Sequence, residues 1–426
     1  MNNLELGAST MIKFLHFADI HLGVENYGRI DTHTGLHSRL TDFIQSLTTA
    51  IDIALEEKVD FALFCGDAYK NNSPSPTHQR EFASQIYRLS KENIPTILIN
   101  GNHDNPLTYG RASALDIFQT LGVPNVWVVT EPQLISLPTR KGLIQVIGIP
   151  WPTRNQYLQK EEYRDSDINL INRKIQKRLQ KTIINLINQL DKRYPKILAA
   201  HLTVTEAVFS GSENYATMGY DPVIATQFFR DTPCDYIALG HIHRYQNLND
   251  AGNPPIVYCG SIDRINFGEE KEDKGFCIGS IDEQGRVNYE FIPLPVRKMI
   301  TIEAKIGDSL NPTEDLIAEI EEYDLKDALV RINYEVSDEQ NKNIDFKKID
   351  EALQEAFLVT SITRNLPAKS STIRRSSLSE DMDIYSALQE YLKLQNWQTW
   401  EKDLKKITQQ LQQELYHRNE PSGKEE

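Results

Sequence analysis

From residue 12 onward, the chain alternates short apolar runs with longer segments whose apolar residues recur at helical spacing. The runs lack strict alternation, which predicts strands buried on both faces of a sheet, and the intervening segments predict helices that cover those faces. The predicted strands are Ile12–Ala18, Phe61–Cys65, Thr96–Ile99, Ile144–Ile149, Ile197–Ala200, Tyr236–Leu239 and Val257–Cys259, and the predicted helices are Leu36–Lys58, Thr77–Glu92, Arg111–Leu121 and Ile168–Leu190. This pattern predicts a layered α/β domain that extends to about residue 293.

A smaller unit follows the segment Pro293-Leu294-Pro295, because two prolines break any helix and mark a boundary. Apolar and polar residues alternate over 300–306 and again over 330–336, which predicts two half-buried strands. Pro312 marks the start of a helix between them, a second helix follows at 346–353, and a short strand follows at 358–362. We therefore expect the α/β domain over residues 11–293 and a small α+β accessory unit over residues 296–364.

The two ends of the chain carry weaker signals. A polar, basic stretch over 365–377 contains Lys369, Arg374 and Arg375, which either contact a DNA backbone or are simply solvated. Residues 378–417 carry apolar stripes at helical spacing and predict helices that pack on their own domain or dock onto a partner helix. Residues 1–10 lack the features of a signal peptide and are expected to carry no function, since Met11 directly precedes the first strand.

Composition narrows the class of protein. The chain has 46 Lys and Arg against 60 Asp and Glu, a net charge of −14, which argues against nucleic-acid binding through charge alone. A polyanionic partner would therefore require local basic patches or bound cations. The four cysteines are widely spaced, as in proteins of a reducing compartment, and no apolar run approaches the ~18 residues of a membrane span. We expect a cytoplasmic protein without a membrane partner.

Polar side chains that can bind a metal follow five of the predicted strands, at the point where each strand ends. In open α/β sheets, ligands bind beyond the carboxyl ends of the strands, so these side chains are expected to converge. Each alone would most simply be structural or part of a turn, but five of the ten histidines hold such positions, and the set predicts a shared site. His16, in contrast, lies inside the first strand and is predicted to be a core residue. The strand-end residues are Asp19 and His21; Asp67; Asn102, His103 and Asp104; His201; and His241 and His243.

Such a cluster predicts bound cations, because buried carboxylates repel one another and must be paired. Two divalent ions would use the full set of ligands, and Asp67 is the natural carboxylate for them to share. A mixture of His, Asp and Asn without thiolate suits Mn²⁺, Fe²⁺ or Zn²⁺ and disfavours Ca²⁺. Two such ions ~3.5–4 Å apart can clamp a phosphoryl group and hold its leaving oxygen.

The motif set of the calcineurin-like metallophosphoesterases is similar, in order and spacing, to five segments of this chain: Asp19-Ile-His21, Gly66-Asp67, Gly101-Asn102-His103-Asp104, His201 and Gly240-His241-Ile242-His243. The sequence of residues 18–23 and 101–105 further resembles the Mre-type double-strand-break nucleases, whose bacterial members are the SbcD subunits of SbcCD complexes. The resemblance covers the chain to about residue 293, and the accessory unit matches the capping domain of that family in position and size.

This resemblance implies a metallophosphoesterase sandwich and a role for each strand-end residue. One metal would be held by Asp19, His21, Asp67 and His243, and the second by Asp67, Asn102, His201 and His241. His103 would lie beside the scissile phosphate as a general acid or transition-state stabiliser, a role that suits imidazole near neutral pH, and Asp104 would orient it. The expected cofactors are two divalent ions, most simply Mn²⁺.

One position departs from the family pattern. Many relatives carry a further His three residues after the bridging Asp, where this chain has Lys70. A lysine can contact a phosphate as a point charge, but it cannot act as a neutral donor, which leaves the balance of exonuclease and endonuclease activity open. The other possibility for Lys70 is a solvated loop residue.

Three functional hypotheses remain at this stage. The first, implied by the resemblance, is a DNA nuclease for repair and recombination that cuts double-stranded ends, single strands or both, together with an SbcC-type ATPase whose coiled coil receives the C-terminal helices. A homodimer is compatible with this hypothesis. The second is a phosphatase or small-nucleotide phosphodiesterase, because fold alone does not fix the substrate. The third is a non-catalytic scaffold, which the complete ligand set argues against.

Overall fold

The computed structural model describes residues 11–106, 111–158, 167–211, 221–250, 252–307, 309–365, 388, 392 and 404–408. The chain divides into two compact units, one of residues 1–304, 313–334 and 345–363 and one of residues 305–312, 335–344 and 364–426. The predicted C-terminal helices over 378–417 lie outside the described residues except at 388, 392 and 404–408, as do Lys369, Arg374, Arg375 and residues 1–10.

The first of two large sheets contains the N-terminal strand. Four of its strands, from β1 to β4, run parallel, whereas β13 and β14 are antiparallel additions beside β1. The parallel register places the carboxyl ends of β1, β2 and β3 at one edge. In spatial order the strands are β14 (Val287–Pro293), β13 (Gly275–Ile281), β1 (Ile12–Phe17), β2 (Phe61–Phe64), β3 (Thr96–Ile99) and β4 (Val126–Val129).

The second large sheet is built around three neighbouring parallel pairings. β7 pairs with both β6 and β10, and β10 pairs with β12, all in parallel, while β5 and β11 close the two edges in antiparallel fashion. In spatial order the strands are β11 (Gln246–Asn247), β12 (Ile256–Tyr258), β10 (Tyr236–Gly240), β7 (Lys196–His201), β6 (Gly142–Ile149) and β5 (Gln133–Thr139); a separate two-stranded sheet pairs β8 (Thr203–Val204) with β9 (Val223–Ile224).

The two large sheets pack face to face, and side chains from both form the central core. Successive residues of a strand point to opposite faces, so Phe14 and Leu63 lie in the layer between the sheets, whereas Leu15 and Phe64 lie in the outer layer. The same alternation on β7 places Ile197 in the central core. This arrangement explains why the strands lack a polar face, since every residue of β1 to β3 except Lys13 is buried.

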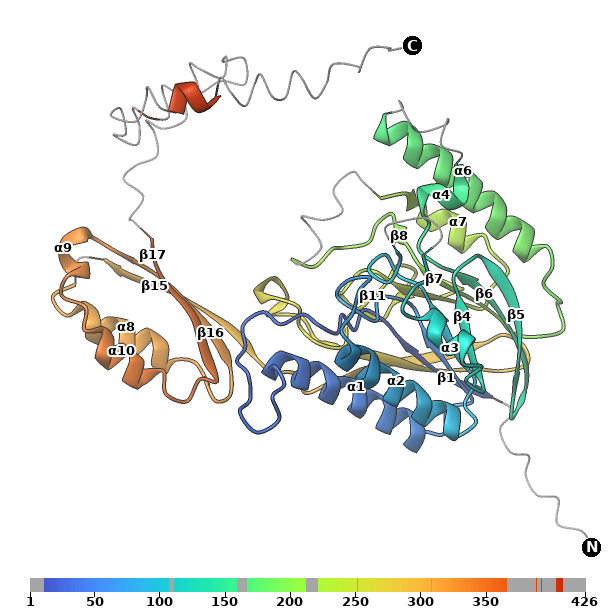
Figure 1. Ribbon diagram of the computed structural model, residues 1–426, viewed down its shortest axis with the longest axis horizontal. Helices are drawn as coiled ribbons and strands as arrows, with labels where there is room; N and C mark the ends of the chain where they lie inside the picture. Colours follow the sequence, from blue (N-terminus) through green and yellow to red (C-terminus); the bar gives the residue numbers. More distant parts are fainter. Residues whose placement is uncertain are drawn as a thin grey trace, which may run out of the picture. The chain divides into compact units, whose positions relative to one another are not determined.

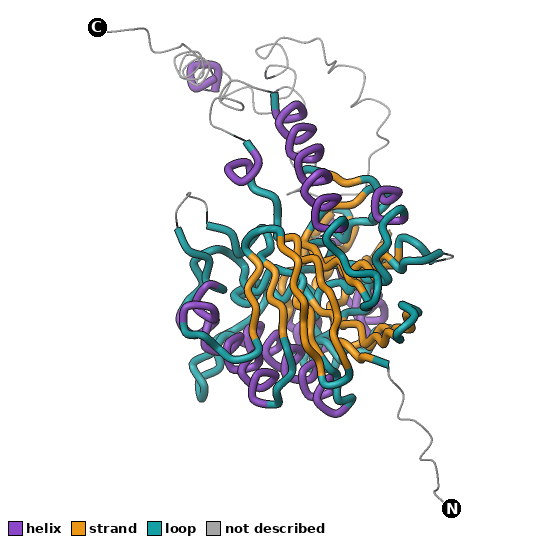
Figure 2. The backbone as a smooth tube through the Cα atoms, turned by 90° about the vertical axis from the view of Figure 1, so that its right-hand side faces the viewer, coloured by secondary structure: helices purple, strands orange, loops and turns teal. Residues whose placement is uncertain are grey.

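Helices cover the outer faces of both sheets (Figures 1 and 2). The helices α1 and α2 bury Phe43, Leu47 and Phe82 against the first sheet, and α6 buries Ile175 and Leu179 against the second. The layers are therefore helix, sheet, sheet and helix. The helices are α1 (Ser38–Glu56), α2 (Pro76–Lys91), α3 (Asp116–Thr120), α4 (Arg154–Tyr157), α6 (Ile168–Ile187) and α7 (Thr226–Arg230), and a 3₁₀ turn, η1, spans Phe267–Glu269.

A three-stranded sheet follows the two large ones in the sequence, in the order β15 (Met299–Gly307), β16 (Leu329–Val336) and β17 (Leu358–Asn365). Its helices are α8 (Pro312–Glu321), α9 (Asp338–Asn341) and α10 (Phe346–Ala352). Buried and more exposed residues alternate along β16, as the apolar pattern predicted. Within the smaller unit, Arg364 donates to the carbonyl oxygen of Val336 and pairs with Asp338 at 2.8 Å.

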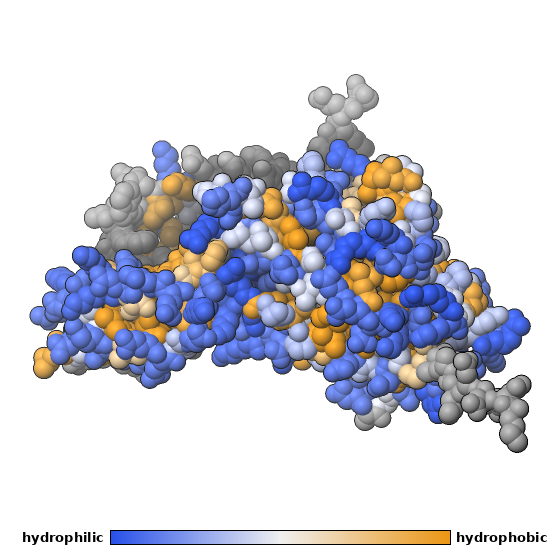
Figure 3. Space-filling view, turned by 90° about the horizontal axis from the view of Figure 1, so that it is seen from below, coloured by the Kyte–Doolittle hydropathy of each residue, from blue (hydrophilic) through white to orange (hydrophobic). Residues whose placement is uncertain are grey.

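The α/β fold class is confirmed, and each predicted strand has a counterpart within one or two residues of the predicted bounds, except that β17 extends three residues beyond the predicted 358–362. The helix predicted over 111–121 is wrong in length, because only Asp116–Thr120 is helical. Several strands were missed, of which β5, β13 and β14 are the longest, because their alternating polar residues face outward beside antiparallel partners. No helix within the described residues is long and apolar enough to cross a membrane, and the face drawn in Figure 3 is mostly hydrophilic, with separate apolar patches.

Candidate metal centre

The loops that follow β1 and β2 are joined by backbone hydrogen bonds. The N–H groups of Asp19, Ile20 and Leu22 donate to carbonyl oxygens of the β2 loop at 2.9, 2.9 and 3.0 Å, respectively. These bonds extend the parallel pairing of the two strands beyond their ends. They hold the side chains of Asp19, His21 and Asp67 at one edge of the sheet.

The buried carboxylate of Asp104 fixes two of these loops together. It accepts hydrogen bonds from the backbone N–H groups of Asp67 at 2.8 Å, Ala68 at 3.0 Å and Gly101 at 3.0 Å. The imidazole of His103 has a different partner, because its Nδ1 lies 2.7 Å from the carbonyl oxygen of Lys70. The structure therefore corrects the prediction that Asp104 orients His103 directly: Asp104 organises the loops after β2 and β3, and the backbone of Lys70 holds the ring.

Four of the candidate residues adopt left-handed backbone conformations. The φ angles are 52° for Asp19, 50° for His21, 60° for Asp67 and 99° for His241. Residues other than glycine rarely occupy this region, and such conformations concentrate at functional sites where the surrounding structure enforces them. The backbone strain at these positions is an independent indication that the strand ends form a site.

Two glycines allow the loops to approach closely. A Cβ atom at Gly101 would lie 2.0 Å from Oδ1 of Asp67, and one at Gly66 would lie 2.3 Å from Nδ1 of His201. Gly66 also has a φ of 97°, which a side chain would disfavour. Both glycines are therefore required by the close approach of Asp67 and His201, not only by a turn.

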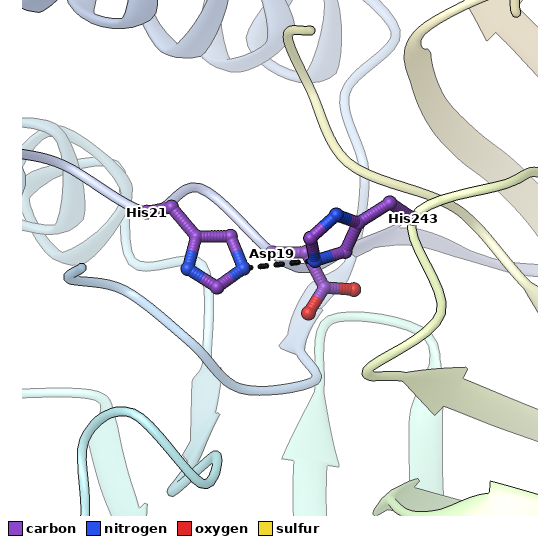
Figure 4. Close-up of side chains that lie close together, drawn as sticks. All are labelled: Asp19, His21 and His243. Atoms are coloured by element: carbon purple, nitrogen blue, oxygen red, sulfur yellow. Dashed lines mark hydrogen bonds between the residues drawn. The ribbon is translucent and has the colours of Figure 1, made fainter. Parts of the chain in front are cut away.

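The first cluster combines Asp19, His21 and His243, whose ligand atoms lie within 4.8 Å of one another. Figure 4 shows the two imidazoles directed at each other, with the carboxylate of Asp19 beside them. The Nε2 atoms of His21 and His243 are 3.0 Å apart. The Asp19 carboxylate also accepts a hydrogen bond from the backbone N–H of His241, which ties the first sheet to the second.

The second cluster combines Asp67, His201 and His241, with the same limit of 4.8 Å. The side-chain oxygen of Asn102 lies between the two imidazoles, 2.9 Å from Nε2 of His201 and 3.0 Å from Nδ1 of His241. Asp67 Oδ2 lies 3.4 Å from Nε2 of His201 and 3.7 Å from Nε2 of His21. Asp67 is thus next to both clusters, and its other oxygen accepts the backbone N–H of His103 at 2.8 Å.

Burial and proximity shift the protonation of these groups in opposite directions. Burial raises the pKa of the Asp19 carboxyl to about 7, against the pull of His201, and lowers the pKa of His21 well below its usual value. Burial would also raise the pKa of Asp67, but His201 and His103 overcome this effect and hold it well below its usual range. Burial lowers the pKa of His201, yet Asp67 more than offsets this and raises it to about 9. Burial thus disfavours the ionised form of Asp19, whereas the histidine neighbours of Asp67 keep that carboxylate ionised.

The residues present fit divalent metal ions. Within the described part of the chain, neither Asp19 nor Asp67 forms an ion pair with a lysine or arginine, so imidazoles and backbone N–H groups are their polar neighbours. Two Nε2 atoms that face each other at 3.0 Å can share a cation but cannot both be protonated without repulsion. The oxygen and imidazole donors suit transition metals of intermediate softness.

Sequence reasoning missed the groups that lie behind the candidate ligand histidines. The Nδ1 atom of His201 lies 2.6 Å from the carbonyl oxygen of Cys65, Nδ1 of His243 lies 3.0 Å from the buried Glu269, and Nε2 of His241 lies 3.3 Å from Asp221. Glu269 and Asp221 are not at strand ends, and no spacing rule connects them to a histidine.

Two further predicted residues can be placed, together with one neighbour that was not predicted. His16 is fully buried, with Nδ1 3.1 Å from the hydroxyl of Tyr236 and Nε2 3.1 Å from the carbonyl oxygen of Leu239, which confirms it as a core residue. The side chain of Lys70 is exposed, and its backbone carbonyl oxygen contacts the ring of His103. Trp151, which sequence reasoning did not single out, packs against the ring of His241 with centroids 4.7 Å apart.

Comparison with known proteins adds an independent finding. Residues 12–245 match the sequence model of a protein family, the calcineurin-like phosphoesterases. The chain is 29% identical over 259 residues to the DNA double-strand break repair protein Mre11 of Archaeoglobus fulgidus, which covers 61% of this chain and 52% of that protein. It is 28% identical over 301 residues to the SbcD component of the nuclease SbcCD of Staphylococcus epidermidis, which covers 70% of this chain and 74% of that protein. The chain thus spans about half the length of the archaeal relative.

Proposed function

The chain belongs to the calcineurin-like phosphoesterase family, and from this premise we propose that it is a metal-dependent DNA nuclease of the SbcD and Mre11 type. It would hydrolyse phosphodiester bonds at double-stranded ends, in single strands or in both. The single observation that carries the proposal is the convergence of six candidate metal-ligating side chains from two sheets around Asp67, with the exposed His103 beside them. Relatives named as nucleases and as a break-repair protein favour DNA over a phosphomonoester.

The proposed ligands divide into two sets that share Asp67. Asp19, His21 and His243 would hold one ion with it, and Asn102, His201 and His241 the other. When bound, two divalent ions would polarise the scissile phosphate, activate water and neutralise the leaving oxygen. We propose Mn²⁺ as the metal, because the mixed imidazole, carboxylate and amide donors suit it.

His103 is the proposed residue for proton transfer or transition-state stabilisation. Its Nδ1 faces the carbonyl oxygen of Lys70 and therefore carries the proton, so its Nε2 is directed away from the backbone. In the protonated ring, Nε2 could donate to the leaving oxygen of a phosphodiester. The hydrogen bond from its own N–H to Asp67 keeps the ring at a fixed place relative to both clusters.

Two other residues have supporting roles in this proposal. Asp104 positions the loops that carry Asp67 and His103 through its backbone hydrogen bonds. Lys70 contacts a DNA phosphate through its exposed side chain, while its backbone carbonyl holds the His103 ring. A charge on a flexible stem supplies affinity without sequence preference.

The proposal extends to partners and domains. The nuclease domain would cover residues 11–293, a capping domain residues 296–364, and helices over 378–417 would dock onto the coiled coil of an SbcC-type ATPase. Because the chain has a net charge of −14, the ATPase would contribute much of the affinity of the complex for DNA. A homodimer and a cytoplasmic location are compatible with this assembly.

The test is a cleavage assay on an end-labelled duplex and on single-stranded DNA with Mn²⁺, with and without the ATPase. The proposal predicts metal-dependent cleavage that EDTA abolishes, and much slower turnover of an aryl phosphomonoester. If the chain hydrolyses the phosphomonoester faster than DNA under every metal, it is a phosphatase and the proposal is wrong.

A further inference from the structure

A buried charged pair lies directly behind one of the ligand histidines. Glu269 and Lys274 are both almost fully buried, with 0% and 1% of their surface exposed, and Nζ of Lys274 lies 2.9 Å from Oε2 of Glu269. The other carboxylate oxygen, Oε1, lies 3.0 Å from Nδ1 of His243. The backbone of the same histidine also takes part, because its carbonyl oxygen accepts a hydrogen bond from Lys274 at 3.0 Å.

The surroundings hold this pair in one geometry. Oε2 of Glu269 also accepts the backbone N–H of Ile265 at 2.9 Å, and Lys274 has a third acceptor in Glu272 at 2.9 Å. Glu269 is the last residue of η1, whose first residue, Phe267, packs in a small apolar cluster with Met299. Burying a charge is costly unless it is paired and hydrogen-bonded, and here every charged atom has a partner.

The three ligand histidines of the second sheet differ in what lies behind them. The partner of His201 is the neutral carbonyl of Cys65, and that of His241 is the half-buried carboxylate of Asp221 at 3.3 Å. His243 alone among these three has a fully buried carboxylate that a lysine neutralises. A carboxylate behind an imidazole fixes the proton on the nitrogen that faces it and makes the other nitrogen a stronger metal ligand.

From this geometry we infer that Glu269, held by Lys274, is a positioning residue that fixes the tautomer of His243 and strengthens metal binding where Asp19, His21 and His243 converge. In the other cluster, Asp221 is the corresponding carboxylate: it lies 3.3 Å from Nε2 of His241 but does not meet hydrogen-bond geometry there. The inference rests on the proposed function, because it assumes that both clusters bind metal. It predicts that each carboxylate controls one ion and not the other.

The experiment compares Glu269→Gln with Asp221→Asn in the full chain by calorimetric titration with Mn²⁺. The glutamine amide is nearly the same size as the carboxylate, but it carries no charge and can present an N–H to His243, which favours the tautomer that cannot bind a metal through Nε2. We expect wild type to show two binding events, Glu269→Gln to weaken one about 10–100-fold, and Asp221→Asn to weaken the other. The double variant should show both losses.

Thermal unfolding of the metal-free variants provides the control for folding. If Glu269→Gln does not fold, Lys274→Gln removes the charge behind Glu269 but keeps a donor, and it should weaken the same event by a smaller factor. Equal weakening of both events by either substitution, or unchanged affinity in a folded Glu269→Gln protein, would overturn the inference. A folded wild-type chain that binds no Mn²⁺ would instead contradict the proposed function itself.

Discussion

The two large sheets contribute to the metal centre in different ways. The first sheet supplies both carboxylates and the amide: Asp19, Asp67 and Asn102, together with His21. Backbone hydrogen bonds join the loops after β1 and β2, and the Asp104 carboxylate joins the loop after β3 to the loop after β2. The second sheet supplies His201, His241 and His243, and each has a separate acceptor behind its ring. The first sheet thus provides the carboxylates, and the second provides imidazoles that each have a separate acceptor behind the ring.

Because of this difference, a substitution on the first sheet should affect both clusters, whereas a substitution on the second should affect one. On the first sheet, Asp104 and the close approach at Gly101 position Asp67 for both clusters at once. On the second sheet, a change behind His243 or His241 should affect one cluster alone. Substitutions on the first sheet are therefore expected to have the larger effects.

The largest effect is expected for Asp67→Asn. The change removes the one carboxylate that lies beside both clusters, so both ions should be lost or bound weakly. We expect the rate of DNA cleavage to fall by at least about 10³-fold, the scale of losing a group that stabilises transition-state charge. Metal content and cleavage rate, measured on the same sample, check this. Two tightly bound ions in the variant would show that Asp67 is not a ligand that both ions share.

The next effect is expected for His103→Ala. The imidazole lies on the first sheet but outside both ligand sets, so both ions should remain while cleavage slows by about 10²–10⁴-fold, the usual contribution of acid–base catalysis. Exposed His33, which lies in a different loop, provides the matched control as His33→Ala. Loss of an ion in His103→Ala would make this residue a ligand, contrary to its proposed role.

A smaller effect concerns His16, which lies on β1 and bonds to β10, and so joins the two sheets directly. Burial lowers its pKa from 6.5 to about 3. Below about pH 6.5, His16 therefore binds a proton in the unfolded chain but not in the folded chain. The contribution of neutral His16 to the free energy of unfolding is complete above that pH and is lost as pH falls toward 3. The loss between pH 7.5 and 5.5 should be about 1 kcal/mol.

Chemical denaturation at several pH values measures this effect. His16→Gln keeps a donor and an acceptor but does not titrate, so its free energy of unfolding should fall less steeply with acid by about 1 kcal/mol over that range. Identical pH dependence in the two proteins would mean that His16 does not titrate as its burial requires.

The smallest effect is expected for Lys70→Ala. The carbonyl that holds His103 remains, so catalysis at saturating DNA should change little, whereas loss of one phosphate contact should weaken DNA binding about 2–5-fold and reduce its salt dependence by about one charge. Binding isotherms at several salt concentrations check this. An unchanged salt dependence would show that Lys70 is only a solvated loop residue.

The sequence predicts the candidate ligands that follow the strands of the first sheet better than the carboxylates that lie behind the histidines of the second. Apolar runs that end in Asp67 or Asn102 identify both a strand and a ligand, because strand and ligand adjoin in the sequence. Glu269 and Asp221 could not be found in this way, since 26 residues separate Glu269 from His243 and only the folded chain brings them together. The role of Asp104 was misjudged for a related reason: neighbours in sequence share a loop, but the carboxylate turns toward backbone N–H groups of another loop.

The central claim is that Asp67 is shared by two metal ions whose other ligands come from both sheets. Crystals grown with Mn²⁺ and measured at the manganese absorption edge test it most directly. We expect two anomalous peaks ~3.5–4 Å apart, one beside His21 and His243 and one beside His201 and His241, both within bonding distance of the Asp67 carboxylate. A single peak, or two peaks of which one lies beyond bonding distance of Asp67, would contradict it.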